Sequence, residues 1–365
     1  MLDLHKLFVD VFNPQPGETA LMLMDTPHDQ IHDNPAWEQR RAMAERWHAA
    51  LRELGEQRGF HVQPPINYPA TGSSNAQLPE EGQQAGKPVR LQDEAAQATL
   101  ILALTEFSAS APLIVWTQQF PRLRAASMPG VAPEMESTAL AADYALVARS
   151  CKRLYDRLAG ADYARIGFSN GDTLTLDLRF RDPRVDDGRL WGDKEAPRLV
   201  NLPSGEAYTA VYEGERPGIP SDTRGVLPVP WLGDVIRLEI EKNRVVDVLS
   251  HGEAAEDLRN FLTIEAARCN VAELGLGCNP MARVWGSVLE DEKAGPHIAL
   301  GRSEHLGGTT GPDAFGDPRY VWHHDFVYAR ESPIHVARMT LVDPQGQEQL
   351  LVVNGHYAAE LEIGI

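Results

Sequence analysis

The stretch VWHHDFVYA, residues 321–329, places two histidines and an aspartate in a run with the composition of a β-strand. Side chains two positions apart in a strand point to the same face. His323 and Asp325 are therefore expected to converge, with His324 pointing away. The pair would offer a metal ion one nitrogen and one or two oxygen ligands. A core histidine beside a surface aspartate is the alternative, and this motif alone does not separate the two.

The stretch LEDEKAGPHIALG, residues 289–301, sets three carboxylates and a lysine before a turn and an apolar run. The turn Lys-Ala-Gly-Pro can fold the chain back, so that Glu292 and His297 reach one point. We expect Glu290 and Asp291 to face solvent. A solvated loop in front of a strand is the alternative interpretation.

Two further glutamates stand in unusual surroundings. Glu206 follows a Pro-Ser-Gly turn in NLPSGEAYTA, and Glu273 lies inside the apolar, glycine-rich segment VAELGLGCNP. Burying a carboxylate is unfavourable unless it has a partner, which a metal ion would supply. The alternatives are a turn carboxylate at the start of a strand and an exposed glutamate that caps a loop.

Taken together, these motifs offer three glutamates, two histidines and an aspartate. A structural zinc site often uses thiolates, but Cys151, Cys269 and Cys278 do not cluster in the sequence. Six nitrogen and oxygen ligands suit two divalent ions about 3.5–4 Å apart, with a bridging carboxylate. Such ions polarise a carbonyl and activate water, which is hydrolytic chemistry. The sequence has no phosphate-binding loop or dinucleotide fingerprint.

Composition limits the class of protein. The 365 residues suggest about two domains, and the net charge of −18 argues against nucleic acid as a partner. The odd number of cysteines argues against a disulfide framework, and Cys151 is expected in a core. We see no signal peptide and no apolar run of about 20 residues, so neither a membrane span nor a membrane partner is expected. A cytoplasmic location is the expectation.

The pattern changes along the chain. Residues 1–190 alternate buried strands, such as residues 19–27, with helices such as residues 34–55, which predicts an α/β domain with a mostly parallel sheet. Residues 63–87 are rich in Pro, Gly and Gln and are predicted to form a surface loop. Residues 191–365 are predicted to form a β-rich α+β domain carrying the metal site, and the polar segment 184–198 marks the boundary. Asn170-Gly171 indicates a hairpin.

The motifs NLPSGE, AELGLGCNP, LEDEKAGPHIALG and HHD occur in an order that resembles the M29 aminopeptidases, the aminopeptidase T family. MDTPHD and ASMPGV near the N-terminus fit the same family, so the likeness covers most of the chain. The resemblance implies a homodimer with two divalent ions per chain, zinc, cobalt or manganese. It implies the metal ligands Glu206, Glu273, Glu292, His297, His323 and Asp325. Glu273 would bridge the ions and manage the proton of the activated water.

The chain departs from that family at one position. These peptidases usually carry a tyrosine after the HIALG run, thought to steady the tetrahedral intermediate, and here Glu304 or His305 stands in its place. We expect His305 to donate the hydrogen bond, which an ionised Glu304 could not do. Tyr320, Tyr328 and Tyr357 are the other candidates for this role.

The resemblance implies a leucyl aminopeptidase-like activity that hydrolyses N-terminal residues of short peptides. The alternative is a ring-cleaving dioxygenase of the 2,5-dihydroxypyridine type, with one non-haem iron. In those relatives a histidine matches Glu273, and the carboxylates matching Glu206 and Glu292 are missing. His297, His323 and Asp325 could still form a two-histidine, one-carboxylate iron site. A third possibility is a metal-binding protein of this fold that hydrolyses another small amide or has lost activity.

Overall fold

The structure, a computed structural model, describes residues 2–191 and 198–363. The chain divides into two compact units: Met1–Ala148 with Asp186–Ser204, and Arg149–Val185 with Gly205–Ile365. The predicted boundary at residues 190 and 191 falls within a stretch that belongs to the first unit, and residues 149–185 group with the second. Residues 192–197 of the predicted polar linker lie outside the described residues. No described helix is long and apolar enough to cross a membrane.

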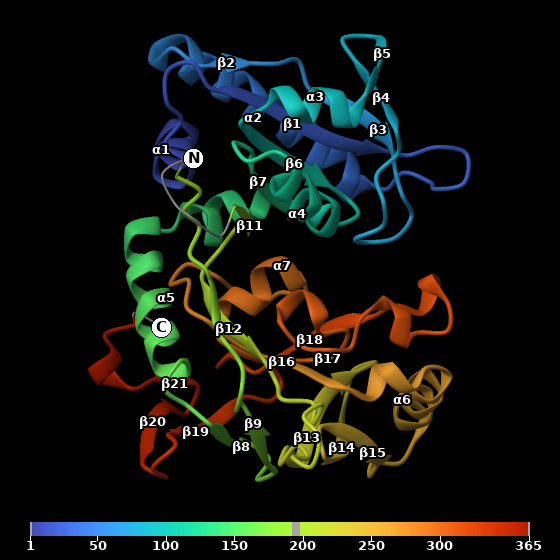
Figure 1. The fold of residues 1–365 in the computed structure, drawn as a ribbon, viewed down its shortest axis with the longest axis vertical. Coiled ribbons are helices and arrows are strands. Elements are labelled where there is room, and N and C mark those ends of the chain that lie inside the picture. Colours follow the sequence, from blue (N-terminus) through green and yellow to red (C-terminus); the bar gives the residue numbers. More distant parts are fainter. Residues whose placement is uncertain (1, 192–197, 364–365) are drawn as a thin grey trace. The chain divides into compact units, whose positions relative to one another are not determined.

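The first unit contains a mostly parallel sheet with the order β11-β7-β6-β1-β3-β4-β5, and β2 pairs with β1 (Figure 1). Its strands are β1 (Thr19–Thr26), β2 (His61–Val62), β3 (Ile66–Pro69), β4 (Glu81–Gln84), β5 (Lys87–Arg90), β6 (Leu100–Thr105), β7 (Arg124–Pro129) and β11 (Leu199–Asn201). This agrees with the predicted parallel sheet. The predicted surface loop over residues 63–87 is wrong, because β3, β4 and β5 form antiparallel pairs there.

Helices cover the sheet of the first unit. They are α1 (Leu4–Phe12), α2 (Pro35–Arg58), α3 (Leu91–Gln97) and α4 (Ser110–Gln119), with the short 3-10 helices η1 (Pro133–Ser137) and η2 (Ala139–Ala141). Leu21 and Leu23 of β1 lie in a core cluster with residues of α3 and α4. Met22 of the same strand points to the other face and is also buried. Burial on both faces explains the continuous apolar runs of this sheet.

The second helix begins where the sequence predicts and ends later. The side chain of Asn34 accepts a hydrogen bond from the Trp37 amide, and proline occupies the first helical position. The predicted end at Gly55 is wrong by three residues, because the helix continues to Arg58 and Gly59 adopts the left-handed conformation. Gly55 instead packs closely inside the helix: a Cβ there would lie 2.8 Å from the Phe60 carbonyl oxygen.

A buried carboxylate organises the end of β1. Asp25 is only 1% exposed and accepts hydrogen bonds from the amides of Glu106 and Phe107 and from the Trp37 indole nitrogen. Burial raises the pKa of Asp25, while these hydrogen bonds and the nearby Arg40 act in the opposite direction. The carboxylate therefore ties β1 to α2 and to the loop after β6.

We expect Asp25→Asn to destabilise the first unit by about 2 kcal/mol, because the amide group would face a backbone N–H that loses its acceptor. Chemical unfolding followed by tryptophan fluorescence would measure this. Asp29→Asn, at an exposed position nearby, is the control and should change the unfolding free energy by less than about 0.5 kcal/mol. Equal effects of the two substitutions would contradict the role given to Asp25.

The second unit is β-rich. A five-stranded sheet has the order β10-β12-β16-β17-β18, and an eight-stranded sheet has the order β15-β14-β13-β9-β8-β19-β20-β21 (Figure 1). The five-stranded sheet uses β10 (Arg184–Asp186), β12 (Glu206–Ala210), β16 (Val271–Gly277), β17 (Pro296–Gly301) and β18 (His323–Val327). The eight-stranded sheet uses β8 (Tyr163–Phe168), β9 (Thr173–Asp177), β13 (Arg224–Trp231), β14 (Asp234–Glu241), β15 (Arg244–Val248), β19 (Val336–Val342), β20 (Glu348–Val353) and β21 (His356–Tyr357). The hairpin predicted at Asn170-Gly171 is confirmed, since β8 and β9 pair antiparallel across it.

Few helices accompany these sheets. The α-helices are α5 (Tyr144–Leu158), which contains the division between the two units, α6 (Glu253–Ile264) and α7 (Val288–Asp291). The 3-10 helices are η3 (Ala266–Cys269), η4 (Glu292–Ala294), η5 (Glu304–Leu306), η6 (Pro312–Ala314), η7 (Pro318–Tyr320) and η8 (Ala359–Leu361). Cys151 of α5 is fully buried, as predicted.

Candidate metal centre

One face of the five-stranded sheet collects five of the six predicted ligands. In an antiparallel pair, residues directly opposite each other point to the same face. Asp325 is opposite Ala299, which is opposite Glu273 on the next strand. His297 is opposite Gly275, His323 is opposite Gly301, and Glu206 is opposite Gly277. Each ionisable side chain therefore has a glycine or alanine beside it, which leaves room above the sheet.

The ligand atoms form two groups that share Glu273. Atoms of Glu206, Glu273 and His297 lie within 4.8 Å of one another, and so do atoms of Glu273, His323 and Asp325. Glu273 Oε1 is 3.8 Å from His297 Nε2, and its Oε2 is 3.2 Å from His323 Nε2. The two oxygens of one carboxylate thus face two different imidazoles. This arrangement is compatible with a carboxylate that bridges two ions.

The two groups fit a metal ion by their chemistry and burial. Glu206 Oε2 is 3.3 Å from His297 Nε2, is buried, and has no hydrogen-bond partner among the described residues. A buried carboxylate oxygen without a donor is unfavourable, and a cation beside it would remove that penalty. Imidazole and carboxylate ligands suit zinc, manganese or iron, so the donor set does not select one metal.

Backbone carbonyls orient both imidazoles. His323 Nδ1 donates to the Arg302 carbonyl oxygen at 2.7 Å, and His297 Nδ1 lies 3.4 Å from the Gly295 carbonyl oxygen. These contacts leave each Nε2 directed toward the carboxylates. The same arrangement fixes the tautomer of metal-binding histidines in general.

The charged groups of the cluster strongly shift one another's pKa values. Burial raises the pKa of Glu206 and Glu273, but their cationic and imidazole partners outweigh it, and the pKa of Glu273 falls to about 2. Although burial opposes it, the neighbouring carboxylates raise the pKa of His297 and His323 well above its usual value. Metal ions bound here would take the place of protons on these rings.

The sixth predicted ligand, Glu292, belongs to neither group. It lies in η4, and burial raises its pKa to about 8 despite the opposing charge of Lys293. Lys293 is the residue beside the two groups that the sequence did not reveal. Its side chain is fully buried, and Nζ lies 2.6 Å from both Glu206 Oε1 and Glu292 Oε1. The position of Lys293 directly after three carboxylates could have indicated a buried ion pair, although charged runs of this kind are normally solvated.

The prediction that Glu290 and Asp291 face solvent is wrong. Glu290 is 0% and Asp291 8% exposed. The Glu290 carboxylate accepts from the Arg283 amide and the Trp285 indole, and Asp291 accepts from the amides of Trp285 and Gly286. Both carboxylates therefore hold the loop before α7, and burial raises the pKa of Asp291.

His305 lies beside the cluster. Its ring meets that of His323 edge to face, with centroids 5.1 Å apart. Burial lowers the pKa of His305, so the ring is neutral near pH 7 and has one N–H to donate. Glu304 pairs with Arg302, and its Oε2 also lies 3.6 Å from His305 Nδ1. Tyr328 and Tyr357 donate their hydroxyls to the carbonyl oxygens of Pro228 and Gly277, and Tyr320 is 38% exposed.

Glu213 anchors the loop that carries His305. Its carboxylate accepts from the Thr309 amide at 2.9 Å and from the hydroxyls of Ser303, Thr309 and Thr310. Burial opposes these hydrogen bonds, but they prevail and lower the pKa of Glu213. A carboxylate distant in the sequence thus holds residues on both sides of His305 in this loop.

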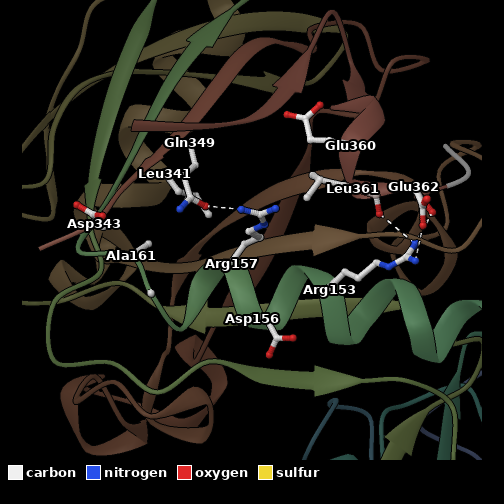
Figure 2. A pocket seen from close by; sticks show the side chains of 11 residues that line it. Arg153, Asp156, Arg157, Ala161, Leu341, Asp343, Gln349, Glu360, Leu361 and Glu362 are labelled. Atoms are coloured by element: carbon white, nitrogen blue, oxygen red, sulfur yellow. Dashed lines mark hydrogen bonds and ion pairs between the residues drawn. The ribbon is translucent and has the colours of Figure 1, made fainter. Parts of the chain in front are cut away.

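The second unit also has a surface cavity away from these residues. It has a volume of about 590 Å³ and lies between α5, β19, β20 and η8 (Figure 2). None of the predicted ligands lines it. Its arginines are already engaged: Arg157 donates to Gln349 at 2.6 Å, and Arg153 donates to the Leu361 and Glu362 carbonyl oxygens. We therefore place the candidate chemistry at the sheet face.

Comparison with known proteins supports the fold. No family model matches the sequence, and no curated protein matches it. The structure is similar to 2,5-dihydroxypyridine dioxygenase from Pseudomonas putida KT2440, with a TM-score of 0.65, 16% identity, and coverage of 98% of this chain and 97% of that one. It is also similar to AmpT, an aminopeptidase T from Thermus thermophilus, with a TM-score of 0.55, 17% identity, and coverage of 97% and 98%. At these identities the shared property is the fold, and both neighbours are enzymes.

We expect Gly275→Ala to weaken metal binding about ten- to a hundredfold, the range seen when a ligand loses its orientation. A Cβ at this position would overlap the His297 ring, so the imidazole must move. Isothermal titration with Zn²⁺ or Mn²⁺ measures the effect. Gly167→Ala is the matched control in another strand, where the nearest atom would be 3.9 Å away. Unchanged affinity in Gly275→Ala would contradict the placement of His297.

The loop bonds of Glu213 should depend on pH. Because its pKa is lowered from 4.5, their stabilising contribution is present above pH 4.5 and is lost as pH falls through the lower folded value. Glu213→Gln should speed hydrogen exchange of residues 303–310 near pH 7, measured by mass spectrometry. Glu331→Gln, at an exposed position, is the control. Equal exchange in both variants would refute the anchoring role.

Proposed function

We propose that this chain is a metal-dependent hydrolase that removes N-terminal residues from short peptides or cleaves another small amide. One observation carries the proposal: Glu273 turns one oxygen to His297 and the other to His323, and a further carboxylate completes each group. A chain that held one ion would need no such doubled arrangement. The aminopeptidase T neighbour makes the same class of chemistry compatible with the fold.

Each residue has a stated role in this proposal. Two divalent ions, zinc, cobalt or manganese, would polarise the substrate carbonyl and lower the pKa of a coordinated water. Glu206, Glu273 and His297 would hold one ion, and Glu273, His323 and Asp325 the other. Glu273 would also accept the proton of the attacking water and deliver it to the leaving amine. The neutral ring of His305 would donate a hydrogen bond to the developing oxyanion.

A second candidate is the iron-dependent dioxygenase reaction. The specific observation in its favour is that Lys293 engages Glu206 and Glu292. This leaves Glu273, His323 and Asp325 as a group whose carboxylates Lys293 does not contact, and these three residues could hold a single iron. The dioxygenase neighbour has the same fold. The homodimer and the cytoplasmic location stay predictions.

We expect about two divalent ions per chain in protein purified without added metal or chelator, and hydrolysis of dipeptides with a free amino terminus. Glu273→Ala should lose both ions and lower the hydrolysis rate by at least about a thousandfold, since it removes a ligand from each group. Elemental analysis and an amine-release assay measure the two effects. Glu241→Ala, at an exposed position on β14, should leave both unchanged.

The outcomes separate the candidates. Two ions with peptide hydrolysis support the hydrolase. One iron per chain, with oxygen consumption on hydroxylated aromatic rings, would establish the second candidate instead. Full metal content and turnover in Glu273→Ala would show that the chemistry lies elsewhere in the protein.

A further inference from the structure

Lys293 is an unusual residue for its position. It lies in η4, its side chain is 0% exposed, and its ammonium group contacts Glu206 Oε1 and Glu292 Oε1 at 2.6 Å each. A lysine is almost never fully buried unless its charge is paired. Here the pairing partners are two of the carboxylates that the sequence assigned to metal ions.

The backbone holds Lys293 in this place. The Asn279 amide donates to the Lys293 carbonyl oxygen at 3.0 Å, and the Gly277 amide donates to the Gly295 carbonyl oxygen at 3.0 Å. Gly277 has no side chain, and a Cβ there would overlap the backbone of Glu292 and Lys293. The turn therefore packs directly on β16, so the ammonium group enters the cluster from a fixed base.

The positive charge of Lys293 offsets the repulsion among the carboxyl groups of the cluster. Glu206, Glu273, Glu292 and Asp325 bring four carboxyl groups into a buried site, where like charges repel strongly. A buried carboxylate is tolerated when a cation pairs with it. The ammonium supplies that cation for Glu206, whose other oxygen faces His297. A metal ion that binds Glu206 must therefore share this carboxylate with the Lys293 ammonium.

This competition acts unequally on the two groups. Glu206 belongs to the first group, with Glu273 and His297. The second group, Glu273, His323 and Asp325, contains neither of the two carboxylates to which Lys293 is bonded. The ammonium of Lys293 thus reduces the negative charge that the first group offers to an ion. It does not contact the carboxylates of the second group.

We propose that Lys293 is an internal cation that competes with metal ions for Glu206, so that the first group binds its ion more weakly than the second. Lys293 would then determine how many ions the protein holds at a given metal concentration. This inference rests on the metal centre of the proposed function, and it does not require that the substrate be a peptide.

The test removes the charge and measures metal binding. Lys293→Gln retains a hydrogen-bond donor for the carboxylates, and Lys293→Met retains the length of the side chain. In isothermal titration with Mn²⁺ the wild-type protein should bind two ions with unequal affinity. In both variants the weaker ion should bind at least tenfold more tightly, and the affinity of the tighter ion should change less than threefold. Lys152→Gln, which removes an exposed lysine paired with Asp156, should change neither.

Two results would overturn the inference: unchanged affinities, or weaker binding of the first-group ion, which would mean that Lys293 only positions the carboxylates. If neither variant folds, selective ¹⁵N labelling of lysine in the wild-type protein decides the question. The buried ammonium signal should shift with the second equivalent of metal and not with the first. No shift after two equivalents would refute competition. Peptide hydrolysis is not needed for either readout, so its absence would count against the proposed function alone.

Discussion

The second unit depends on one constraint, which is that carboxylates buried on a sheet face need cations beside them. Glu206 on β12 and Glu273 on β16 are buried, and Asp325 on β18 is partly buried, so water solvates these carboxylates poorly. The cationic groups beside them are the imidazoles of His297 and His323 and the ammonium of Lys293. Removing one of these cations would leave the carboxylates with fewer partners for their charge, which is destabilising in a buried site.

Small residues make this concentration of charge possible. Gly275 and Gly277 on β16, with Ala299 and Gly301 on β17, stand opposite the ionisable side chains in the strand register. A larger side chain at Gly275 would displace His297, and one at Gly277 would displace the turn that delivers Lys293. Glycine weakens a strand by itself, so its use here follows from the need for room above the sheet.

Much of the site could be predicted from local periodicity, and the rest could not. The alternation of a strand correctly brings His323 and Asp325 together, 3.6 Å apart, and sends His324 into a stack with Trp322. The burial of Glu290, Asp291 and Lys293 escaped prediction because local sequence says charged runs are solvated. Glu206, the partner of Lys293, is 87 residues away in the sequence, and the partner of Glu290 is the Trp285 indole in the loop before α7. The strands at residues 66–69 and 81–84 were missed likewise, because pairing with β1 and β5 overrides a composition typical of loops.

The proposed hydrolase and the alternative oxygenase differ in the number of cations that the sheet face would hold. A hydrolase needs the charge of two ions to polarise an amide, whereas an oxygenase needs one iron with open positions. Four carboxyl groups with one ammonium leave a net negative charge that one divalent ion would not neutralise, provided that most of the carboxyl groups are ionised. Glu292 is the exception, because burial raises its pKa to about 8. Its protonation would bring the charge closer to that of a single-ion site, and the charge of Lys293 opposes that protonation without outweighing burial. The charge of the cluster therefore depends on Glu206, Glu292 and Lys293 together.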